Sequence, residues 1–350
     1  MKQHRSVHLL TLSLLAGSLL ALSATAQEHQ KLAQTGFQFL SVVSDARAAA
    51  MGEAMTTLPL GSAALFFNPA GMAGIDGQVD FSASLNKWIA DINHSTVALA
   101  WKPWHGDFGV LGLSFQLVDY GDFYGTRVTN TALGYEDMGI FTVKPSFAIG
   151  LGYAKQLNDQ FSVGGQIRWV QQNLGESMTS ANIQEFNPGT DSSYRTADTV
   201  MVQNKLHPFV FDFGTQFKTG FKSLVFGMSV RNFSGEVKYA SEGFQAPLMF
   251  TLGISMDLID LTGNFGMDQS LYLSVDASHH RDHPEQVKVG LEYGVMKMVY
   301  LRAGYASSAN DETDFTYGLG VSKFGFTLDY AYTPYGIFGS VQRMTVRYLY

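Results

Sequence analysis

The last ten residues of the chain alternate between apolar and polar side chains. The apolar positions are Met344, Val346, Tyr348 and Tyr350, and the polar positions between them are Arg343, Thr345 and Arg347. Because successive side chains of a β-strand point to opposite faces, this segment predicts a strand with one apolar and one charged face. A strand of about ten residues with this alternation is typical of a wall between lipid and a wet lumen.

The same pattern recurs from residue 79 onwards, with a turn after each run. We predict fourteen strands, and bacterial single-chain barrels require such an even number. They cover residues 79–86, 94–102, 108–118, 145–157, 161–173, 205–218, 223–233, 247–257, 270–278, 286–294, 298–306, 313–321, 324–331 and 341–350. Each charge on the polar faces would cost a few kcal/mol near the middle of a bilayer, so these faces must line a lumen.

The predicted lumen carries charges of both signs. They are Arg168, Asp212, Lys218, Arg231, Asp257, Asp276, Lys288, Glu292, Arg302, Asp329, Arg343 and Arg347. A selective pore usually presents a ring of one sign. Mixed signs favour internal ion pairs that stiffen the wall or hold a plug.

The connections between the strands differ in length on the two sides. Those near 119–144, 174–204 and 234–246 are long, whereas those near 158–160 and 322–323 are tight. This sorting is typical of outer-membrane barrels, which place long loops outside and short turns in the periplasm. A soluble β-sandwich is the alternative, but it has no reason to sort its loops. Since only a closed sheet pairs every backbone group in hydrocarbon, we predict an all-β fold, a 14-stranded antiparallel transmembrane β-barrel.

The composition agrees with a barrel. Charged residues make up 15% of the 350 residues and apolar residues 46%, whereas soluble domains have about 25% charged residues. A helical membrane protein would be far more apolar. The net charge of −7 argues against a nucleic-acid partner, and the absence of cysteine excludes disulfides and thiolate metal sites.

The N-terminus has the pattern of an export signal. Lys2 and Arg5 precede an apolar stretch at 9–22, and small residues at 24–26 suit a cleavage site. We therefore expect residues 1–26 to be a signal peptide and the protein to reside in the bacterial outer membrane. An uncleaved anchor is the alternative.

Residues 27–78 lack the strand alternation, and residues 79–350 form the expected barrel. Asp45 can cap a short helix whose first turn holds Arg47, and Gly52 allows close backbone approach. The dipeptide Asn68-Pro69 predicts a turn. We predict that residues 27–78 are a plug (hatch) segment inside the barrel, with packing rather than substrate contact as the role of its motif residues. Those residues are Asp45, Arg47, Met51, Gly52, Asn68, Pro69 and Gly71.

The stretches 44–55, 66–71 and 329–350 resemble the PorV/PorQ family of outer-membrane proteins. That family is similar to the FadL-type long-chain fatty-acid transporters. The resemblance implies a role in type IX secretion, with cargo proteins carrying C-terminal sorting domains, and other secretion components, as partners. The alternative is a FadL-like passive channel for fatty acids or other hydrophobic molecules. A cargo carrier should use the external loops 119–144 and 174–204, whereas a lipid channel should use an apolar pocket against the plug.

Other residues suggest no chemistry. His279, His280 and His283, with Asp282, are expected to form a solvated loop tip rather than a metal site. Three of the four tryptophans, Trp88, Trp101 and Trp104, are expected to anchor the barrel at the lipid headgroups. No Ser-His-Asp grouping is evident, so we expect neither an enzyme nor a cofactor, with an outer-membrane phospholipase or protease as the alternative.

Overall fold

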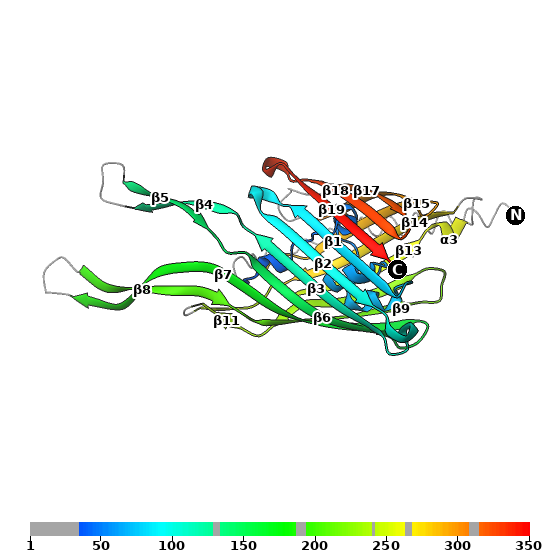
Figure 1. Cartoon of the computed structure of the whole chain (residues 1–350), viewed down its shortest axis with the longest axis horizontal. Coiled ribbons are helices and arrows are strands. Elements are labelled where there is room, and N and C mark those ends of the chain that lie inside the picture. The colour runs from blue at the N-terminus through cyan, green and yellow to red at the C-terminus, as the bar shows by residue number, and fades with distance from the viewer. Residues whose placement is uncertain (1–34, 129–133, 187–193, 240–241, 263–267, 308–314) are drawn as a thin grey trace. The chain divides into compact units, whose positions relative to one another are not determined.

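The computed structural model describes residues 35–128, 134–186, 194–239, 242–262, 268–307 and 315–350 (Figure 1). The expected signal peptide lies outside these residues. The strands are β1 (Val79–Lys87), β2 (Asn93–Trp101), β3 (Val110–Asp119), β4 (Asp122–Val128), β5 (Tyr135–Thr142), β6 (Ser146–Gln156), β7 (Phe161–Phe186), β8 (Tyr194–Leu206), β9 (Phe209–Lys218), β10 (Val225–Ser234), β11 (Val237–Lys238), β12 (Gly243–Phe244), β13 (Met249–Asp257), β14 (Gln269–His280), β15 (Gln286–Val295), β16 (Val299–Ala306), β17 (Phe315–Lys323), β18 (Phe326–Pro334) and β19 (Ser340–Leu349).

The helices of the described residues are all short. They are the α-helices α2 (Ala46–Ala50) and α3 (Ile259–Thr262), and the 3₁₀ helices η1 (Gln38–Leu40), η2 (Gly61–Phe66), η3 (Pro69–Gly74), η4 (Ile89–Asp91), η5 (Pro103–Gly106) and η6 (Gly336–Phe338). In this part of the chain no helix combines the length and the hydrophobicity needed to cross a bilayer.

Fourteen strands of the described residues close into one antiparallel barrel, which confirms the predicted fold. Around the ring the order is β6-β3-β2-β1-β19-β18-β17-β16-β15-β14-β13-β10-β9-β7, and β7 pairs back onto β6. The first and last barrel strands are neighbours, with Phe81 opposite Tyr348. Each predicted segment contains one barrel strand, and most boundaries agree to within a few residues. The exceptions are β7, which was predicted to end at 173 but continues to Phe186, and the segment 205–218, which also takes in the end of β8.

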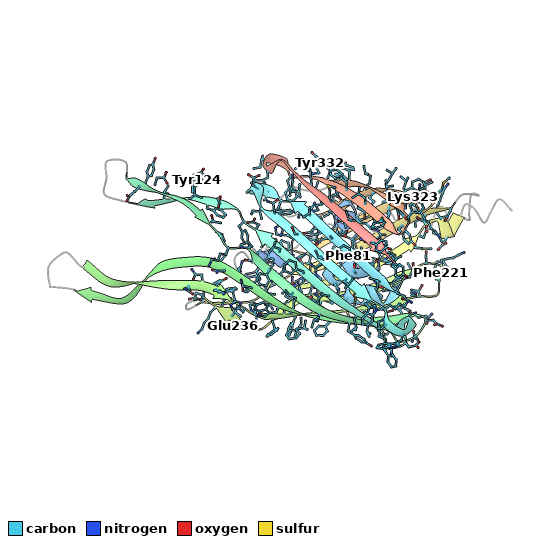
Figure 2. The ribbon with its side chains drawn as sticks, viewed as in Figure 1. Phe81, Tyr124, Phe221, Glu236, Lys323 and Tyr332 are labelled. Carbon is cyan, nitrogen blue, oxygen red and sulfur yellow. The ribbon has the colours of Figure 1, made fainter. Side chains whose placement is uncertain are left out.

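The two faces of the wall differ as the alternation predicts. On β19, Arg343 and Thr345 are buried toward the lumen, whereas Met344 and Val346 are 51% and 43% exposed on the outside. Aromatic and aliphatic side chains cover the outer face of the barrel (Figure 2). Trp101 and Trp104 are exposed together at the rim of short turns, as expected for residues at the headgroup level.

Trp88 does not lie at the lipid interface, so this expectation is wrong. It follows β1 in register with the lumen-facing Asn86, so its side chain turns inward. The Arg343 guanidinium lies 5.3 Å from the centroid of its ring, and the Tyr335 ring lies 5.0 Å away. The cation and the second aromatic ring hold the indole over the lumen.

All three long connections that we expected to be loops contain strand pairs, the shortest being β11 with β12. Strand β4 pairs with β5, and the end of β7 pairs with β8 beyond the barrel, where β7 has no other neighbour among the described strands. Both hairpins extend from the rim of long loops, and Tyr124 lies on the first of them (Figure 2). Strand β8 ends before Pro208, whose missing N–H interrupts the ladder, and β9 enters the barrel after it.

A β-bulge in β10 changes which side chains enter the lumen. The register with β9 shifts between Val230 and Phe233, and Asn232 has a φ of 60°. Both Arg231 and Asn232 therefore face inward and are buried, although strict alternation would turn one of them to the lipid.

Residues 35–78 lie inside the barrel, with α2, η2 and η3 against the inner faces of the strands. Their apolar side chains form a core that includes Met51, Met55, Leu58, Leu65 and Met72, each at most 1% exposed. The inner wall opposite them carries small and polar residues such as Ser82, Ser114 and Gly304, which leave room for this segment. We call residues 35–78 the plug.

A closed ladder predicts heat-modifiable migration on SDS gels. The unboiled protein should migrate differently from the boiled protein, because the sheet has no edge from which detergent can open it. Unboiled and boiled samples from isolated outer membranes provide the measurement. Identical migration of a properly folded sample would contradict closure.

Candidate functional site

A chain of ion pairs joins the plug to the wall. Arg47 of α2 donates to both oxygens of Glu292 on β15, at 2.8 Å each, and to the carbonyl of Pro59. Glu292 also pairs with Arg302, which in turn donates to Asp329 at 2.7 Å. All these side chains are nearly free of solvent. Each carboxylate has at least one arginine, so the buried charges compensate one another.

Asp45 fastens the beginning of α2. Its side chain accepts a hydrogen bond from the backbone N–H of Ala48 at 2.8 Å, which makes it the N-cap. The other carboxylate oxygen pairs with Arg347 of β19 at 3.2 Å. The same residue therefore starts the helix and attaches it to the last barrel strand.

Gly52 ends α2 where the backbone of the plug touches the backbone of the wall. Its φ is +59°, and a Cβ at this position would lie 2.7 Å from the Tyr305 carbonyl oxygen. Its N–H donates to the Thr316 hydroxyl at 3.2 Å. Only glycine allows both this conformation and this approach. The neighbouring Met51 is fully buried in the plug core.

Asn68 joins two parts of the plug to β9. Its amide nitrogen donates to the carbonyls of Thr56 and Thr215, at 2.8 and 3.0 Å. Its oxygen accepts from the N–H of Ala70 and so caps η3, which begins at Pro69. Gly214 makes room for this amide, because a Cβ there would meet the Asn68 oxygen. Gly71 packs between Ala64 of the plug and the Gln216 side chain of β9.

The motif residues therefore meet the barrel wall at several separate places rather than lining one cavity. Each of them makes or allows a contact between the plug and a barrel strand. The chemistry of these contacts is capping, ion pairing and close backbone approach. None of them offers a nucleophile with an adjacent base.

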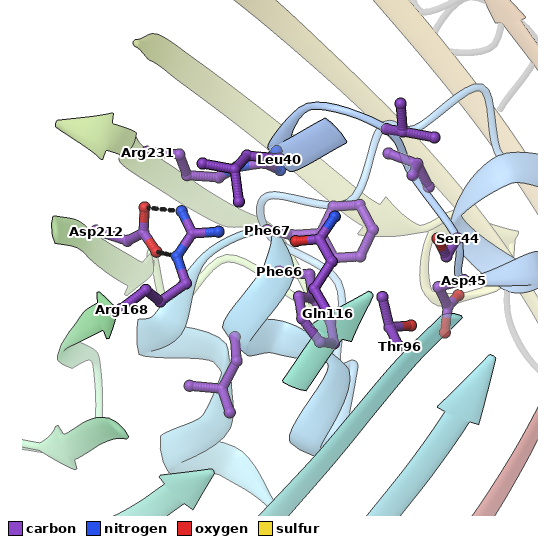
Figure 3. A pocket seen from close by; sticks show the side chains of 13 residues that line it. Leu40, Ser44, Asp45, Phe66, Phe67, Thr96, Gln116, Arg168, Asp212 and Arg231 are labelled. Atoms are coloured by element: carbon purple, nitrogen blue, oxygen red, sulfur yellow. Dashed lines mark hydrogen bonds and ion pairs between the residues drawn. The ribbon is translucent and has the colours of Figure 1, made fainter. Parts of the chain in front are cut away.

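The plug closes most of the lumen near its middle. One cavity there has a volume of about 20 Å³. Its lining includes Phe67 and Gln116, near the ion pair of Arg168 and Asp212 (Figure 3). A second cavity of about 30 Å³ is lined by Glu53, Lys288 and their neighbours. Each has room for about one water molecule, so a solute larger than water cannot pass there while the plug is in this position.

A larger cavity of about 380 Å³ lies at the rim of short turns. The ion-pair chain of Arg47, Glu292, Arg302 and Asp329 forms part of its lining, together with Tyr272 and Tyr300. This cavity is therefore a polar space of mixed charge on the periplasmic side of the plug.

A vestibule of about 930 Å³ opens at the rim of long loops. Aromatic and aliphatic residues from four parts of the chain line it, namely Phe37, Tyr120, Leu174, Tyr239 and Phe244. The Phe244 ring lies 5.9 Å from that of Phe37 and 5.4 Å from that of Tyr239. Polar groups such as Arg281 and Gln172 complete the lining. The vestibule can hold an apolar ligand and offers polar groups for its head.

The two phenols of the vestibule stay neutral over the physiological range. Burial, together with the nearby Tyr120, raises the pKa of Tyr239 to about 12. Burial also raises the pKa of Tyr120. The Tyr239 hydroxyl donates to the side-chain oxygen of Gln172 at 3.3 Å, so the ring is held at the edge of the cavity.

The floor of the vestibule belongs to the plug. The N–H of Gly36 donates to the carbonyl of Gln245 at 3.0 Å, and Thr35 forms a parallel bridge to the same residue. A ligand in the vestibule would therefore touch both the external loops and the start of the plug. Sequence patterns did not indicate this cavity, because its residues are isolated aromatics in segments without periodicity.

A 14-stranded barrel with an internal plug is the architecture of FadL-type outer-membrane proteins, and comparison with solved structures finds this fold. The chain superposes on the Pseudomonas putida toluene transporter TodX with a TM-score of 0.56 at 12% identity, covering 91% of this chain and 98% of that one. The Ralstonia pickettii toluene transporter TbuX superposes with a TM-score of 0.53 at 12% identity, covering 87% of this chain and 98% of that one. A Pseudomonas aeruginosa FadL homologue superposes with a TM-score of 0.51 at 13% identity, covering 87% of this chain and 98% of that one.

At these identities the likeness establishes the fold alone. The closed 14-stranded barrel with its apolar outer face agrees with the predicted location in the bacterial outer membrane. No protein-family model matches the sequence, and no curated protein matches it.

The ion-pair chain predicts a large effect of Arg47→Met on stability. Glu292 would keep only Arg302 as a partner in a buried site, so the free energy of unfolding should fall by about 3 kcal/mol. Urea unfolding in detergent, followed by tryptophan fluorescence, measures it. The control Lys297→Met breaks the exposed pair with Asp268 and should cost less than about 1 kcal/mol. Equal effects would contradict the assigned role of Arg47.

The backbone contact predicts that Gly52→Ala destabilises the protein. The positive φ alone should cost about 1–2 kcal/mol, and the contact with Tyr305 adds to it. A lower thermal unfolding midpoint is expected. Gly74→Ala is the matched control, because no atom lies within 4 Å of the added Cβ. An unchanged midpoint for Gly52→Ala would show that the plug does not press on β16.

Proposed function

We propose that this protein is a FadL-like channel that takes up hydrophobic small molecules across the outer membrane. The vestibule is the observation that carries the proposal, because it joins an aromatic surface at the external rim to the first residues of the plug. The transporters of toluene with the same fold support the class of substrate.

Binding in the vestibule would be driven by the transfer of apolar surface from water to aromatic side chains. Each buried Å² contributes about 25 cal/mol, and a hydrocarbon of modest size gains several kcal/mol in this way. The charged groups of the same lining are of both signs, with Arg281 beside Glu236 and Glu242. The ligand thus meets an apolar surface and charged groups of both signs in one cavity.

Passage from the vestibule through the two small cavities between the plug and the wall would require the plug to move. The cavities of about 20 and 30 Å³ between the plug and the wall are too small for any hydrocarbon. A ligand that packs on Phe37 contacts the start of the plug directly and can bias its position. The ion pairs of Arg47 and Asp45 hold helix α2 of the plug against β15 and β19.

Removal of the aromatic lining should weaken ligand binding. The double variant Tyr239→Ala, Phe244→Ala loses two ring surfaces, so the dissociation constant for a long-chain fatty acid or toluene should rise about tenfold or more. Equilibrium binding to the purified protein in detergent provides the measurement. Uptake into liposomes containing the protein should fall in parallel.

Tyr124→Ala is the control for this experiment. Tyr124 is 81% exposed on the β4–β5 hairpin, away from the vestibule, and should leave binding unchanged. If neither ligand binds the wild-type protein, or if the double variant binds as well as wild type, the channel function is wrong.

A second candidate function is recognition of secreted proteins, as the PorV/PorQ resemblance implies. The β4–β5 hairpin favours it, because it carries Phe123, Tyr124, Tyr135 and Ile140 exposed on the external side. Such a patch suits contact with another protein. The sequence motifs at 44–55 and 66–71 belong to the plug. They support a role in secretion only through the resemblance to the PorV/PorQ family.

Variants tested in the native host can distinguish the channel function from the secretion function. Deletion of the hairpin residues 122–142 should abolish surface attachment of proteins with a shared C-terminal domain if the barrel is a secretion component. The vestibule double variant should then have no effect on attachment. The reverse outcome, normal attachment after hairpin deletion, would exclude this second function.

A further inference from the structure

The end of β14 and the loop after it gather three groups that can bind a metal. His280, Asp282 and His283 each offer one ligand atom, and these atoms lie within 4.8 Å of one another. His280 closes β14, and the other two residues follow in the loop to β15. Only the five residues 281–285 separate the histidine-bearing end of β14 from the start of β15, so the three side chains meet above the lumen.

His280 faces the lumen rather than solvent. It shares the inner face of β14 with Asp276 and Ser278 and lines the small cavity next to the plug. Its Nε2 is buried and has no hydrogen-bond partner within the described residues. A buried imidazole nitrogen without a partner loses its hydration without compensation, unless it binds a proton donor or a metal ion. The His283 ring lies 5.9 Å away.

Asp282 is oriented by the plug. It is 6% exposed, and one of its oxygens lies 2.8 Å from Nδ1 of His283. The other oxygen accepts hydrogen bonds from the Thr35 hydroxyl at 2.7 Å and the Gln38 amide at 2.5 Å. Hydrogen bonds of this kind fix the carboxylate of a metal site and strengthen binding. A carboxylate at a solvated loop tip would have no reason to be buried and held in this way.

We propose that His280, His283 and Asp282 form a site for a divalent transition metal, with Zn²⁺ as the best match. Two imidazoles and one carboxylate are a common zinc set, which leaves a fourth position for water. Mg²⁺ and Ca²⁺ prefer oxygen ligands alone and do not fit. Tetrahedral coordination needs ligand atoms about 3.3 Å apart, and the exposed His283 can rotate to close the site.

The metal would fasten the start of the plug to the external loop. Thr35 and Gln38 contact the ligand Asp282 and also line the vestibule. A bound ion fixes the carboxylate that these two residues hold, so it should restrain residues 35–40 at the floor of the vestibule. Any effect of the metal on the uptake of hydrophobic molecules rests on the proposed channel function. Metal binding and the restraint of the plug do not depend on that function.

Zinc titration tests the site directly. The protein is purified in detergent without a histidine tag, stripped with EDTA and titrated with Zn²⁺ or Mg²⁺ by isothermal calorimetry. We expect one equivalent of Zn²⁺ at micromolar concentration and no binding of Mg²⁺. The double variant His280→Ala, His283→Ala should bind no zinc. Absence of binding by the wild type, or full binding by the double variant, overturns the site.

Two further variants separate this site from histidine binding in general. His279→Ala is the matched control, because the exposed His279 lies on the other face of β14 from His280 and pairs with Glu285 of the following loop. This variant should leave the zinc affinity unchanged. Gln38→Ala should weaken zinc binding about tenfold or more through loss of the bond to Asp282. Heat-modifiable migration on gels confirms that each variant is folded.

Hydrogen exchange of the plug tests the restraint. Zinc should slow amide exchange in residues 35–40 of the wild type at least severalfold, and it should have no effect in the double variant. If zinc leaves amide exchange in residues 35–40 of the wild type unchanged, the proposed restraint of the plug is wrong, although the metal site itself would remain. Neither measurement requires a hydrophobic ligand, so the result is independent of the channel function.

Discussion

The structure depends on one constraint, the need to pair every backbone N–H and C=O group that lies in hydrocarbon. Fourteen strands meet it by closing on themselves, with β1 against β19. A ring of this size encloses more space than the side chains of its own wall can fill. The plug occupies that space, and its apolar core takes the place of the interior that smaller barrels fill with wall residues.

The charges of the inner wall follow from the same closure. They cannot face lipid, so they lie in the lumen, where each needs a partner. Glu292 stands at the centre, because it binds Arg47 of the plug and Arg302 of the wall at once. Such a network contributes little to stability compared with apolar packing of the same volume, but it specifies one position of the plug. A plug that must move between positions can use contacts of this kind.

Several features could be predicted from the sequence and others could not. Period-two alternation located each barrel strand, and the sorted connections oriented the barrel. The hairpins β4–β5 and β7–β8 were taken for loops, because exposed strands outside lipid need no apolar face. Two features depend on the local strand register, which the alternation of side chains along the sequence does not reveal. They are the bulge at Arg231 and Asn232 and the inward turn of Trp88.

The sequence by itself determined the wall, the compartment and the presence of a separate segment before the first strand. These follow from side-chain alternation and composition, which are local properties of the chain. Only the tertiary structure decided which groups meet. It brought Arg47 to Glu292, Thr35 to Asp282 and Phe37 to Phe244, pairs separated by more than 200 residues. The physical reason is ring closure, which sets the wall residues that face each part of the plug, and no local pattern encodes that pairing.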